Sequence, residues 1–351
     1  MSALPEKQAL NVVAIGGGTG LSTLLRGLKR YVRGSEDQAL PAAATISSLT
    51  AIVTVSDDGG SSGRLRKEFN VLPPGDIRNC IVALSEEEEL LSRLFQYRFR
   101  AGEGLKDHNF GNLFLLALSD LTGDFAEAVR LSSEVLATRG RIFPATTSHV
   151  QLEAQMDDGS RVLGETNITA SKRRIVNLRM LPENAEPIAD AIAAIQQADL
   201  ITIGPGSLFT SLVPNLLVNA VPKAICDSHA VKVYVCNLMT QANESLDLSA
   251  ADHIRAIYDH AHCELFDYAI INNAKAPTEL REKYAQEGQE QIAVDVDRIH
   301  ALGVKSILGN YLDVYRREED GAPVVRHNTQ RVSEELVKIG INAKRAPQPS
   351  L

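Results

Sequence analysis

Short runs of β-branched and other apolar residues alternate with longer stretches of helical periodicity along most of the chain. The apolar runs have the length of buried strands, and the stretches between them place apolar residues three or four positions apart. We expect strands at residues 12–15, 52–55, 200–203, 232–236, 268–271 and 304–308. We expect helices at 21–31, 76–84, 112–121 and 250–260, among others. This alternation predicts an α/β fold with a doubly wound, mostly parallel sheet.

The pattern changes at residues 151–169, where two strands are joined by the tight turn Asp157-Asp158-Gly159. We interpret this segment as a small antiparallel β insertion at about 149–169 within one domain. That domain is expected to span 11–341, with an N-terminal extension at 1–10 and a flexible tail at 342–351.

An acidic run follows one of the expected helices, beginning at Ser85 and including Glu88. Ser85 is a suitable N-cap, and Glu88 stands where a capping box places its carboxylate. We therefore expect the run to begin a helix rather than to bind a metal.

Composition excludes several functional classes. The chain has 36 Lys and Arg against 44 Asp and Glu, a net charge of −8, which disfavours general binding to nucleic acid or anionic membranes. Residues 200–222 carry no charge, but their glycines and prolines argue against a membrane span. The four scattered cysteines predict no disulfide framework and a reducing, cytoplasmic location.

A glycine-rich turn follows the first expected strand and leads into a helix. Glycine lets backbone N–H groups approach an anion closely, and a helix N-terminus adds a favourable dipole. The strict dinucleotide fingerprint is not met, because its last glycine position falls on Leu21. A tight turn without a ligand is the alternative interpretation. The candidate anion-binding residues are Gly16, Gly17, Gly18, Thr19 and Gly20.

The second expected strand runs into an acidic, glycine-rich loop, and ligands of open α/β sheets bind at such strand ends. Asp57 and Asp58 are adjacent carboxylates that suit a ribose hydroxyl or a hard cation, so they form the candidate metal site, with Mg²⁺ as the only candidate cofactor. A solvated loop with local turns is the alternative. The other candidates in this loop are Ser61, Ser62, Gly63 and Arg64.

Two further segments place polar residues at helix starts. Asp76 is the expected N-cap of one helix, and Arg78 follows in the first turn, where the dipole disfavours a cation unless an anion is bound. Asn79 belongs to the same segment. The second segment precedes an apolar helix, and its candidate hydrogen-bonding cluster consists of His108, Asn109 and Asn112.

A second glycine turn follows the expected strand at 200–203 and also feeds a helix N-terminus. It therefore predicts a second phosphate cradle. Its candidate residues are Gly204, Pro205, Gly206, Ser207 and Thr210.

Taken in order, these segments resemble the gluconeogenesis factors, the YvcK-type branch of the CofD-like (2-phospho-L-lactate transferase-like) superfamily. The resemblance extends over roughly residues 11–339. The matching segments are IGGGTGLSTLLRGLK at 15–29, VTVSDDGGSSGRLR at 53–66, LPPGDIRNC at 72–80, HNFGNL at 108–113, GETNIT at 164–169, IGPGSLFTSLVPNLL at 203–217 and CNLMTQ at 236–241.

The resemblance implies a cytoplasmic protein with a Rossmann-like three-layer core, tied to cell shape and to growth on gluconeogenic carbon sources. It implies a nucleotide-sugar ligand of the UDP-N-acetylglucosamine type, contacted also by Asn237 of the CNLMTQ segment. Arg326 would reach the diphosphate and Tyr284 would stack on uracil. As partners it implies no nucleic acid and no membrane span, and it leaves open a homo-oligomer and protein partners in cell-wall synthesis.

Three functional hypotheses follow. The first is a nucleotide-sugar-binding regulatory factor. The second is a Mg²⁺-dependent transferase acting on a nucleotide-diphosphate conjugate, in which Asp57 and Asp58 hold the metal and Arg64 and Arg78 stabilise charge on phosphate. The long SDDGGSSGRLR loop is typical of the gluconeogenesis-factor branch and counts against deazaflavin transfer. An NAD-dependent oxidoreductase ranks last because the final glycine of its fingerprint is missing.

Overall fold

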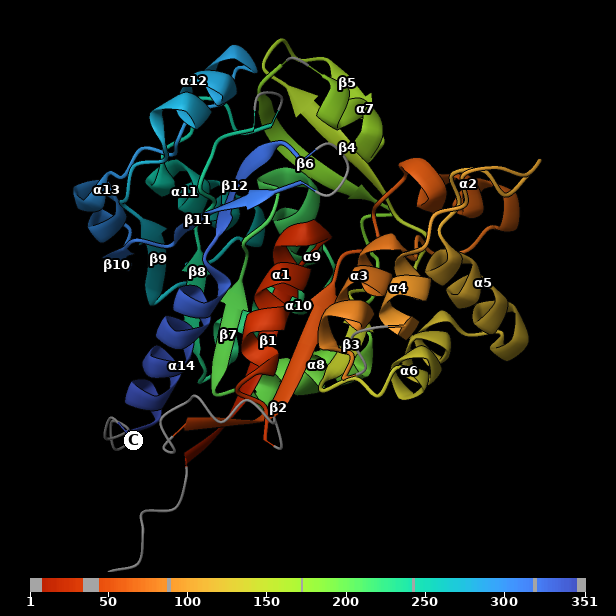
Figure 1. The fold of residues 1–351 in the computed structure, drawn as a ribbon. Helices are drawn as coiled ribbons and strands as arrows, with labels where there is room; N and C mark the ends of the chain where they lie inside the picture. The colour runs from red at the N-terminus through yellow and green to blue at the C-terminus, as the bar shows by residue number, and fades with distance from the viewer. Residues whose placement is uncertain are drawn as a thin grey trace, which may run out of the picture.

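A seven-stranded parallel sheet forms the centre of the molecule (Figure 1). The computed structural model describes residues 8–33, 44–86, 90–171, 173–241, 244–317 and 321–345. The strand order is β10-β9-β8-β7-β1-β2-β3, and every neighbouring pair runs parallel. The strands are β1 (Gln8–Gly16), β2 (Ala44–Val53), β3 (Arg141–Pro144), β7 (Leu200–Ile203), β8 (Val231–Val235), β9 (Tyr268–Asn272) and β10 (Lys305–Gly309).

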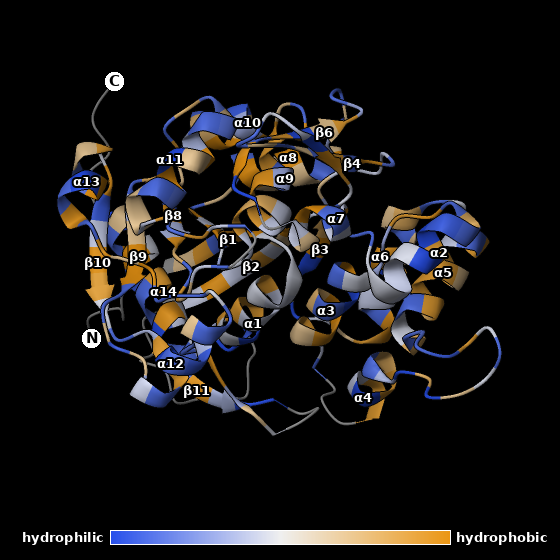
Figure 2. Cartoon of the chain, turned by 90° about the horizontal axis from the view of Figure 1, so that it is seen from above, coloured by the Kyte–Doolittle hydropathy of each residue, from blue (hydrophilic) through white to orange (hydrophobic). Residues whose placement is uncertain are grey.

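Helices cover both faces of this sheet, so the predicted three-layer, doubly wound architecture is confirmed (Figures 1 and 2). Figure 2 shows hydrophobic residues gathered along the sheet and hydrophilic residues on the outward sides of the helices. One face carries α1 (Gly18–Lys29), α3 (Gly75–Leu84) and α14 (Thr329–Arg345). The other carries α8 (Ala189–Gln196), α9 (Val213–Leu216), α10 (Val221–Asp227) and α11 (Ala250–Ala261).

The direction of winding reverses at β1. From β1 the chain first adds β2 and β3 on one side, and later β7, β8, β9 and β10 on the other. The turns after β1 and β7 therefore lie side by side at the carboxyl edge of the sheet, at the point where ligands of such folds bind.

All six strands expected for the parallel sheet are present, although β2 begins well before the predicted residue 52. The antiparallel insertion is larger than predicted. It contains three strands in the order β5-β4-β6, namely β4 (Gln151–Met156), β5 (Arg161–Leu163) and β6 (Ile175–Leu181), with α7 (Glu165–Ala170) between the last two. The interpretation as two strands ending at 169 missed β6 because that strand pairs with β4 across an intervening helix.

The remaining elements lie at the two sides of the sheet. Beyond β3 are α2 (Gly60–Phe69), α4 (Leu90–Gln96), α5 (Phe110–Thr122) and α6 (Phe125–Val135). On the opposite side are α12 (Thr278–Gln286), α13 (Val296–Ala301) and the antiparallel pair β11 (Leu312–Arg316) and β12 (Pro323–His327).

Both predicted ends of the domain need correction. Residues 8–10 belong to β1, with Leu10 fully buried, whereas 1–7 of the expected extension lie outside the described residues. The expected tail at 342–351 begins too early, because α14 continues to Arg345 and Lys344 donates to Asp199 Oδ2 at 2.9 Å. Residues 346–351 are not described.

Ser85 ends a helix instead of starting one. Its amide donates to the carbonyl of Ile81 in α3, and its hydroxyl donates to the carbonyl of Leu136 at 2.9 Å. The expectation of an N-cap at Ser85 was therefore wrong, because a partner far along the chain takes its hydroxyl. Glu88 lies outside the described residues.

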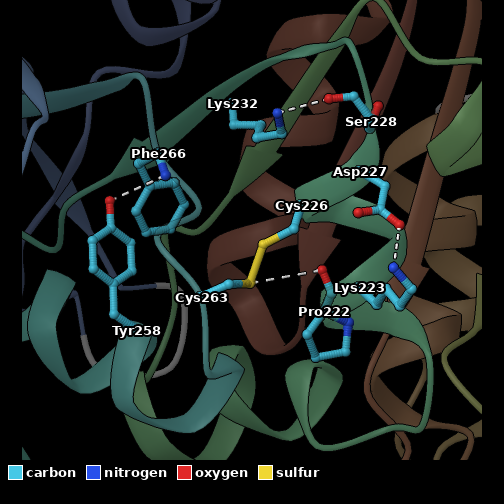
Figure 3. Close-up of a disulfide and its surroundings, with 9 residues drawn as sticks. All are labelled: Pro222, Lys223, Cys226, Asp227, Ser228, Lys232, Tyr258, Cys263 and Phe266. Atoms are coloured by element: carbon cyan, nitrogen blue, oxygen red, sulfur yellow. Dashed lines mark hydrogen bonds and ion pairs between the residues drawn. A yellow bond between two sulfur atoms is a disulfide. The ribbon is translucent and has the colours of Figure 1, made fainter.

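Cys226 and Cys263 form a disulfide, which the scattered spacing of the cysteines did not predict (Figure 3). The bond ties the end of α10 to the segment after α11, and the two cysteines are 37 positions apart in the sequence. Cys80 and Cys236 are buried free thiols.

No single helix among the described residues is long and apolar enough to cross a membrane. In the described part of the chain, one bent pair of helices, Leu208–Leu216 and Val221–Asp227 with 76° between them, meets the criteria of length and composition for a broken span.

Candidate functional site

The first glycine turn links β1 to α1 and lies against the second. Gly18 has a φ of +61°, which favours glycine, and its amide donates to Asp76 Oδ2 at 2.7 Å. A Cβ on Gly20 would lie 2.3 Å from the carbonyl oxygen of Pro205 in the second turn. Because the two backbones touch here, both turns form one continuous floor.

The amides of Thr19 and Gly20 lie in the first turn of α1, where backbone N–H groups have no carbonyl partner within the helix. No side chain caps this helix at Gly17. The Asp76 carboxylate takes the amide of Gly18, so the amides of Thr19 and Gly20 are the groups in this turn that an anion could contact.

The second turn differs from its predicted role. Gly206 N donates to Asn237 Oδ1, and the amides of Phe209 and Thr210 both donate to Glu244 Oε1 at 2.6 Å. The amides of Phe209 and Thr210 lie at the start of the π-helical turn η1 (Leu208–Leu212). The buried Glu244 carboxylate therefore takes the amides that the sequence assigned to a phosphate, and burial raises its pKa to about 7.

A cavity of about 490 Å³ opens above both turns. Thirteen of the predicted site residues contribute to its wall, and they come from segments far apart in the sequence. They are Gly17, Gly18, Thr19, Gly20, Asp57, Asp76, Pro205, Gly206, Ser207, Thr210, Asn237, Tyr284 and Arg326.

One end of the cavity is acidic. Asp57, Asp76 and Glu165 line it, and Asp57 and Asp76 also accept hydrogen bonds from Gly59 N and Gly18 N. Burial raises the pKa of all three, and the nearby negative charge of the other carboxylates adds to this effect. The pKa of Asp76 reaches about 6 and that of Glu165 about 9. Asp76 lies within the first turn of α3, and its N-cap is Pro74, so the predicted capping role was wrong.

Asp58 does not line the cavity. Its Oδ1 accepts hydrogen bonds from the amide of Thr166 at 2.8 Å and from the Thr166 hydroxyl at 2.6 Å. The adjacent carboxylates therefore have different roles: Asp57 faces the cavity and Asp58 holds the start of α7. Among the described residues, no three His, Cys, Asp or Glu side chains are grouped closely enough to hold a metal ion by themselves.

Arg78 belongs to a separate polar cluster beside the cavity. It donates to Asn112 Oδ1 at 3.0 Å and to Asn79 Oδ1 at 2.6 Å, and both Asp76 and Asp57 favour its charge. These partners explain a cation in the first turn of α3 without a bound anion. Burial lowers the pKa of Arg78 to about 10.

The predicted cluster around His108 is real, but it is internal. Ser61 Oγ lies 3.2 Å from His108 Nδ1 and also accepts from Asn112 Nδ2 at 3.2 Å. Asn109 caps α5 by accepting from the amides of Gly111 and Asn112. None of these side chains lines the cavity: Ser61 of α2 holds His108 and Asn112, and Asn109 is used within α5 and by the carbonyl of Gln96. Five other predicted residues also lie outside the cavity wall, namely Gly16, Ser62, Gly63, Arg64 and Gly204. Arg64 donates instead to the carbonyl of Lys106.

The opposite end of the cavity is formed by β12, α12 and the segment after β8. Thr240 N donates to the carbonyl of Glu290, and Ile292 N donates to the carbonyl of Leu238, so two irregular segments pair into a wall. Tyr284 Oη accepts from Val325 N at 3.1 Å, which fixes its ring beside Arg326. These two residues are close together although α12 and β12 are distant in sequence.

Sequence reasoning missed several residues of the wall. Glu165 lay in the GETNIT segment, where a carboxylate directly after the hairpin was an available signal. The two glutamines and His327 had no local signal, because irregular or paired segments place them. The missed wall residues are Glu165, Ser211, Leu238, Met239, Thr240, Gln241, Gln289, Val325 and His327.

Comparison with known proteins identifies the family of the chain. A family model described as "2-phospho-L-lactate transferase CofD" matches residues 12–312. Proteins named "Gluconeogenesis factor" from Halalkalibacterium halodurans and Bacillus subtilis are 45% and 42% identical. The alignments cover 93% and 95% of this chain, and 96% and 98% of the respective relatives.

A crystal structure of a UPF0052-family protein from Bacillus halodurans superimposes with a TM-score of 0.85 at 44% identity. The match covers 94% of this chain and 99% of the other. The chain thus belongs to the CofD family, among relatives that carry the name gluconeogenesis factor.

Proposed function

We propose that the cavity binds a nucleotide sugar of the UDP-N-acetylglucosamine type and that binding regulates the protein's activity toward a partner. The observation that carries this proposal is the shape of one wall. The N-terminus of α1, where Asp76 holds the amide of Gly18, lines the cavity together with Tyr284, Arg326 and three acidic side chains.

This set of groups matches the chemistry of a nucleotide sugar. An aromatic ring and a guanidinium suit a base and a diphosphate, and helix amides suit the diphosphate. Carboxylates suit the hydroxyl groups of a sugar, which are hydrogen-bond donors. The cavity of about 490 Å³ lies within the range of small-molecule sites.

Isothermal titration with UDP-N-acetylglucosamine tests the proposal. We expect micromolar-to-millimolar binding, and Arg326→Ala should weaken it about tenfold or more through loss of contact with the diphosphate. Arg255→Ala is the matched control, because Arg255 is exposed on α11 and does not line the cavity. Lack of binding by the wild type up to millimolar ligand would refute the proposal.

The regulatory role rests on the relatives' name, gluconeogenesis factor. We propose a cytoplasmic location and an effect on cell shape during growth on gluconeogenic carbon sources. A deletion strain complemented with Arg326→Ala tests this role. The variant should fail to restore normal shape on such a carbon source but should have no effect on a glycolytic one.

A Mg²⁺-dependent transferase is the alternative, favoured by the match to the CofD transferase model and by the acidic end. Mg²⁺ keeps several waters and usually takes one or two carboxylates together with phosphate oxygens. Asp57 with Asp76 or Glu165 fits such a partial set, whereas Asp58 does not. When bound, the ion would neutralise charge on the phosphates. Arg64 and Arg78 are directed elsewhere, so Arg326 is the arginine available to the phosphates.

Phosphorus NMR of wild-type protein with Mg²⁺ and UDP-N-acetylglucosamine distinguishes the two functions. Turnover would produce a new phosphorus resonance that Asp57→Asn abolishes while the protein stays folded. If no product forms from any nucleotide sugar tested and Asp57→Asn still binds ligand normally, the transferase alternative fails.

A further inference from the structure

His327 is held by a hydrogen bond that determines which of its ring nitrogens carries a proton. Nε2 lies 3.0 Å from the carbonyl oxygen of Cys236, at the end of β8. A carbonyl oxygen only accepts hydrogen bonds, so Nε2 must be the protonated nitrogen. In the neutral ring, Nδ1 is then an acceptor with a free lone pair.

The acceptor Nδ1 faces open space. It has no hydrogen-bond partner among the described residues, and it is not one of the fully enclosed side-chain atoms that lack a partner. His327 lines the main cavity and a recess of about 40 Å³ between α1 and β12. Thr19, Gly20, Pro205 and Arg326 also line both spaces, so the recess adjoins the cavity.

The ring is neutral near pH 7. Burial lowers its pKa to about 4, and the nearby charge of Arg326 acts in the same direction. A phosphate oxygen is itself an acceptor, so it cannot bond to the bare Nδ1 of a neutral imidazole. The group that satisfies this nitrogen must be a donor.

The position of His327 identifies that donor. On β12 it shares the recess with Thr19 and Gly20 of the first turn of α1, which suits phosphate, and it follows two residues after Val325, whose amide holds Tyr284, which suits a base. In a nucleotide the group between phosphate and base is the ribose, whose hydroxyls are donors. We propose that His327 Nδ1 accepts a hydrogen bond from a ribose hydroxyl of the bound nucleotide and thereby selects ribonucleotides over deoxyribonucleotides.

This inference rests on the proposed nucleotide binding, and the test separates the two. UDP, 2′-deoxy-UDP and 3′-deoxy-UDP are titrated into wild-type protein and into His327→Gln. Glutamine places its amide near Nε2 and keeps the donation to Cys236, but it has no acceptor at Nδ1. We expect wild type to bind UDP about tenfold more tightly than at least one deoxy analogue, and His327→Gln to bind all three alike.

Each outcome decides the matter. If neither UDP-N-acetylglucosamine nor UDP binds wild type, both the proposed function and this inference fail. If UDP-N-acetylglucosamine binds but UDP does not, only this inference fails. If UDP binds but neither deoxy analogue is weaker, or if His327→Gln keeps the discrimination, only this inference fails. Nitrogen NMR of the wild-type imidazole gives a check independent of any variant's folding, since a proton found on Nδ1 instead of Nε2 would also overturn it.

Discussion

Asp58 and Thr166, which are 108 residues apart, are joined by two hydrogen bonds to one carboxylate oxygen, at 2.8 and 2.6 Å. Asp57, the preceding residue, faces the cavity. Asp58→Ala should therefore lower the free energy of unfolding by about 1–2 kcal/mol, the usual effect of losing a helix cap. Asp57→Asn should raise the free energy of unfolding at pH 8, because it removes a partly buried charge that repels the ionised Asp76.

Urea denaturation of both variants measures these opposite signs. Similar losses of stability in the two would contradict the division of roles. Such a result would instead favour a shared function for Asp57 and Asp58.

Gly20 and Gly16 belong to the same turn but differ in the space around them. A Cβ on Gly20 would meet the backbone of Pro205 at 2.3 Å, whereas one on Gly16 would meet side chains no closer than 3.5 Å. Gly20→Ala should lower the free energy of unfolding by about 1–3 kcal/mol and weaken UDP-sugar binding, because the two turns must separate. Gly16→Ala should resemble wild type. Thermal melts with titration check both, and equal behaviour would show that contact between the turns is unimportant.

Glu244 makes stability depend on pH. Burial raises its pKa from 4.5 to about 7, so the folded protein holds this proton more tightly than the unfolded chain does. The associated stability is fully present below pH 4.5 and is lost as pH rises to about 7. Glu244→Gln should match wild type at pH 5 and exceed it at pH 8, by at most about 3 kcal/mol. Urea denaturation at both pH values tests this, and equal stability at pH 8 would contradict it.

Glu165 provides a test for the Mg²⁺ alternative. With a pKa of about 9, it is protonated at pH 7.5, and a metal ligand must lose that proton. Titration of Mg²⁺ and nucleotide in buffers of different ionisation enthalpy should reveal proton release that Glu165→Gln abolishes. When EDTA removes Mg²⁺, we expect no proton release, because the negative charge of the phosphates favours the protonated form of Glu165. Equal release with and without Mg²⁺ would exclude Glu165 as a ligand.

The Cys226–Cys263 disulfide should stabilise the oxidised protein. Closing a loop of 37 residues contributes roughly 3–4 kcal/mol in the chain-entropy description. Reduction should lower the free energy of unfolding by about that amount, and a Cys226→Ser/Cys263→Ser variant should not respond to reductant. Thiol counting in denaturant should give two reactive groups before reduction and four after. Four before reduction would show that the bond does not form.

The sequence by itself determined the local elements and the family. The apolar runs ending before Gly16 and Gly204 predicted two strands, because two buried faces require continuous apolar residues. The glycines after them predicted tight turns, because glycine has no Cβ and can adopt a positive φ such as that of Gly18. The regularities of α/β folds then predicted that ligands bind at the carboxyl ends of the strands, and the cavity lies at that edge of the sheet.

Only the tertiary structure decided which polar side chains face the cavity. Asp57 and Asp58 are indistinguishable in sequence, yet Thr166 takes one of them. Glu244 accepts hydrogen bonds from amides that were expected to bind phosphate. Asn79 and Asn112 accept hydrogen bonds from Arg78, which was expected to bind an anion. His327 is a candidate because the fold brings the end of β12 to the end of β8, where its Nε2 lies 3.0 Å from the carbonyl oxygen of Cys236. A hydrogen bond needs two groups within about 3 Å, and folding brings such groups together over sequence separations that no local pattern records.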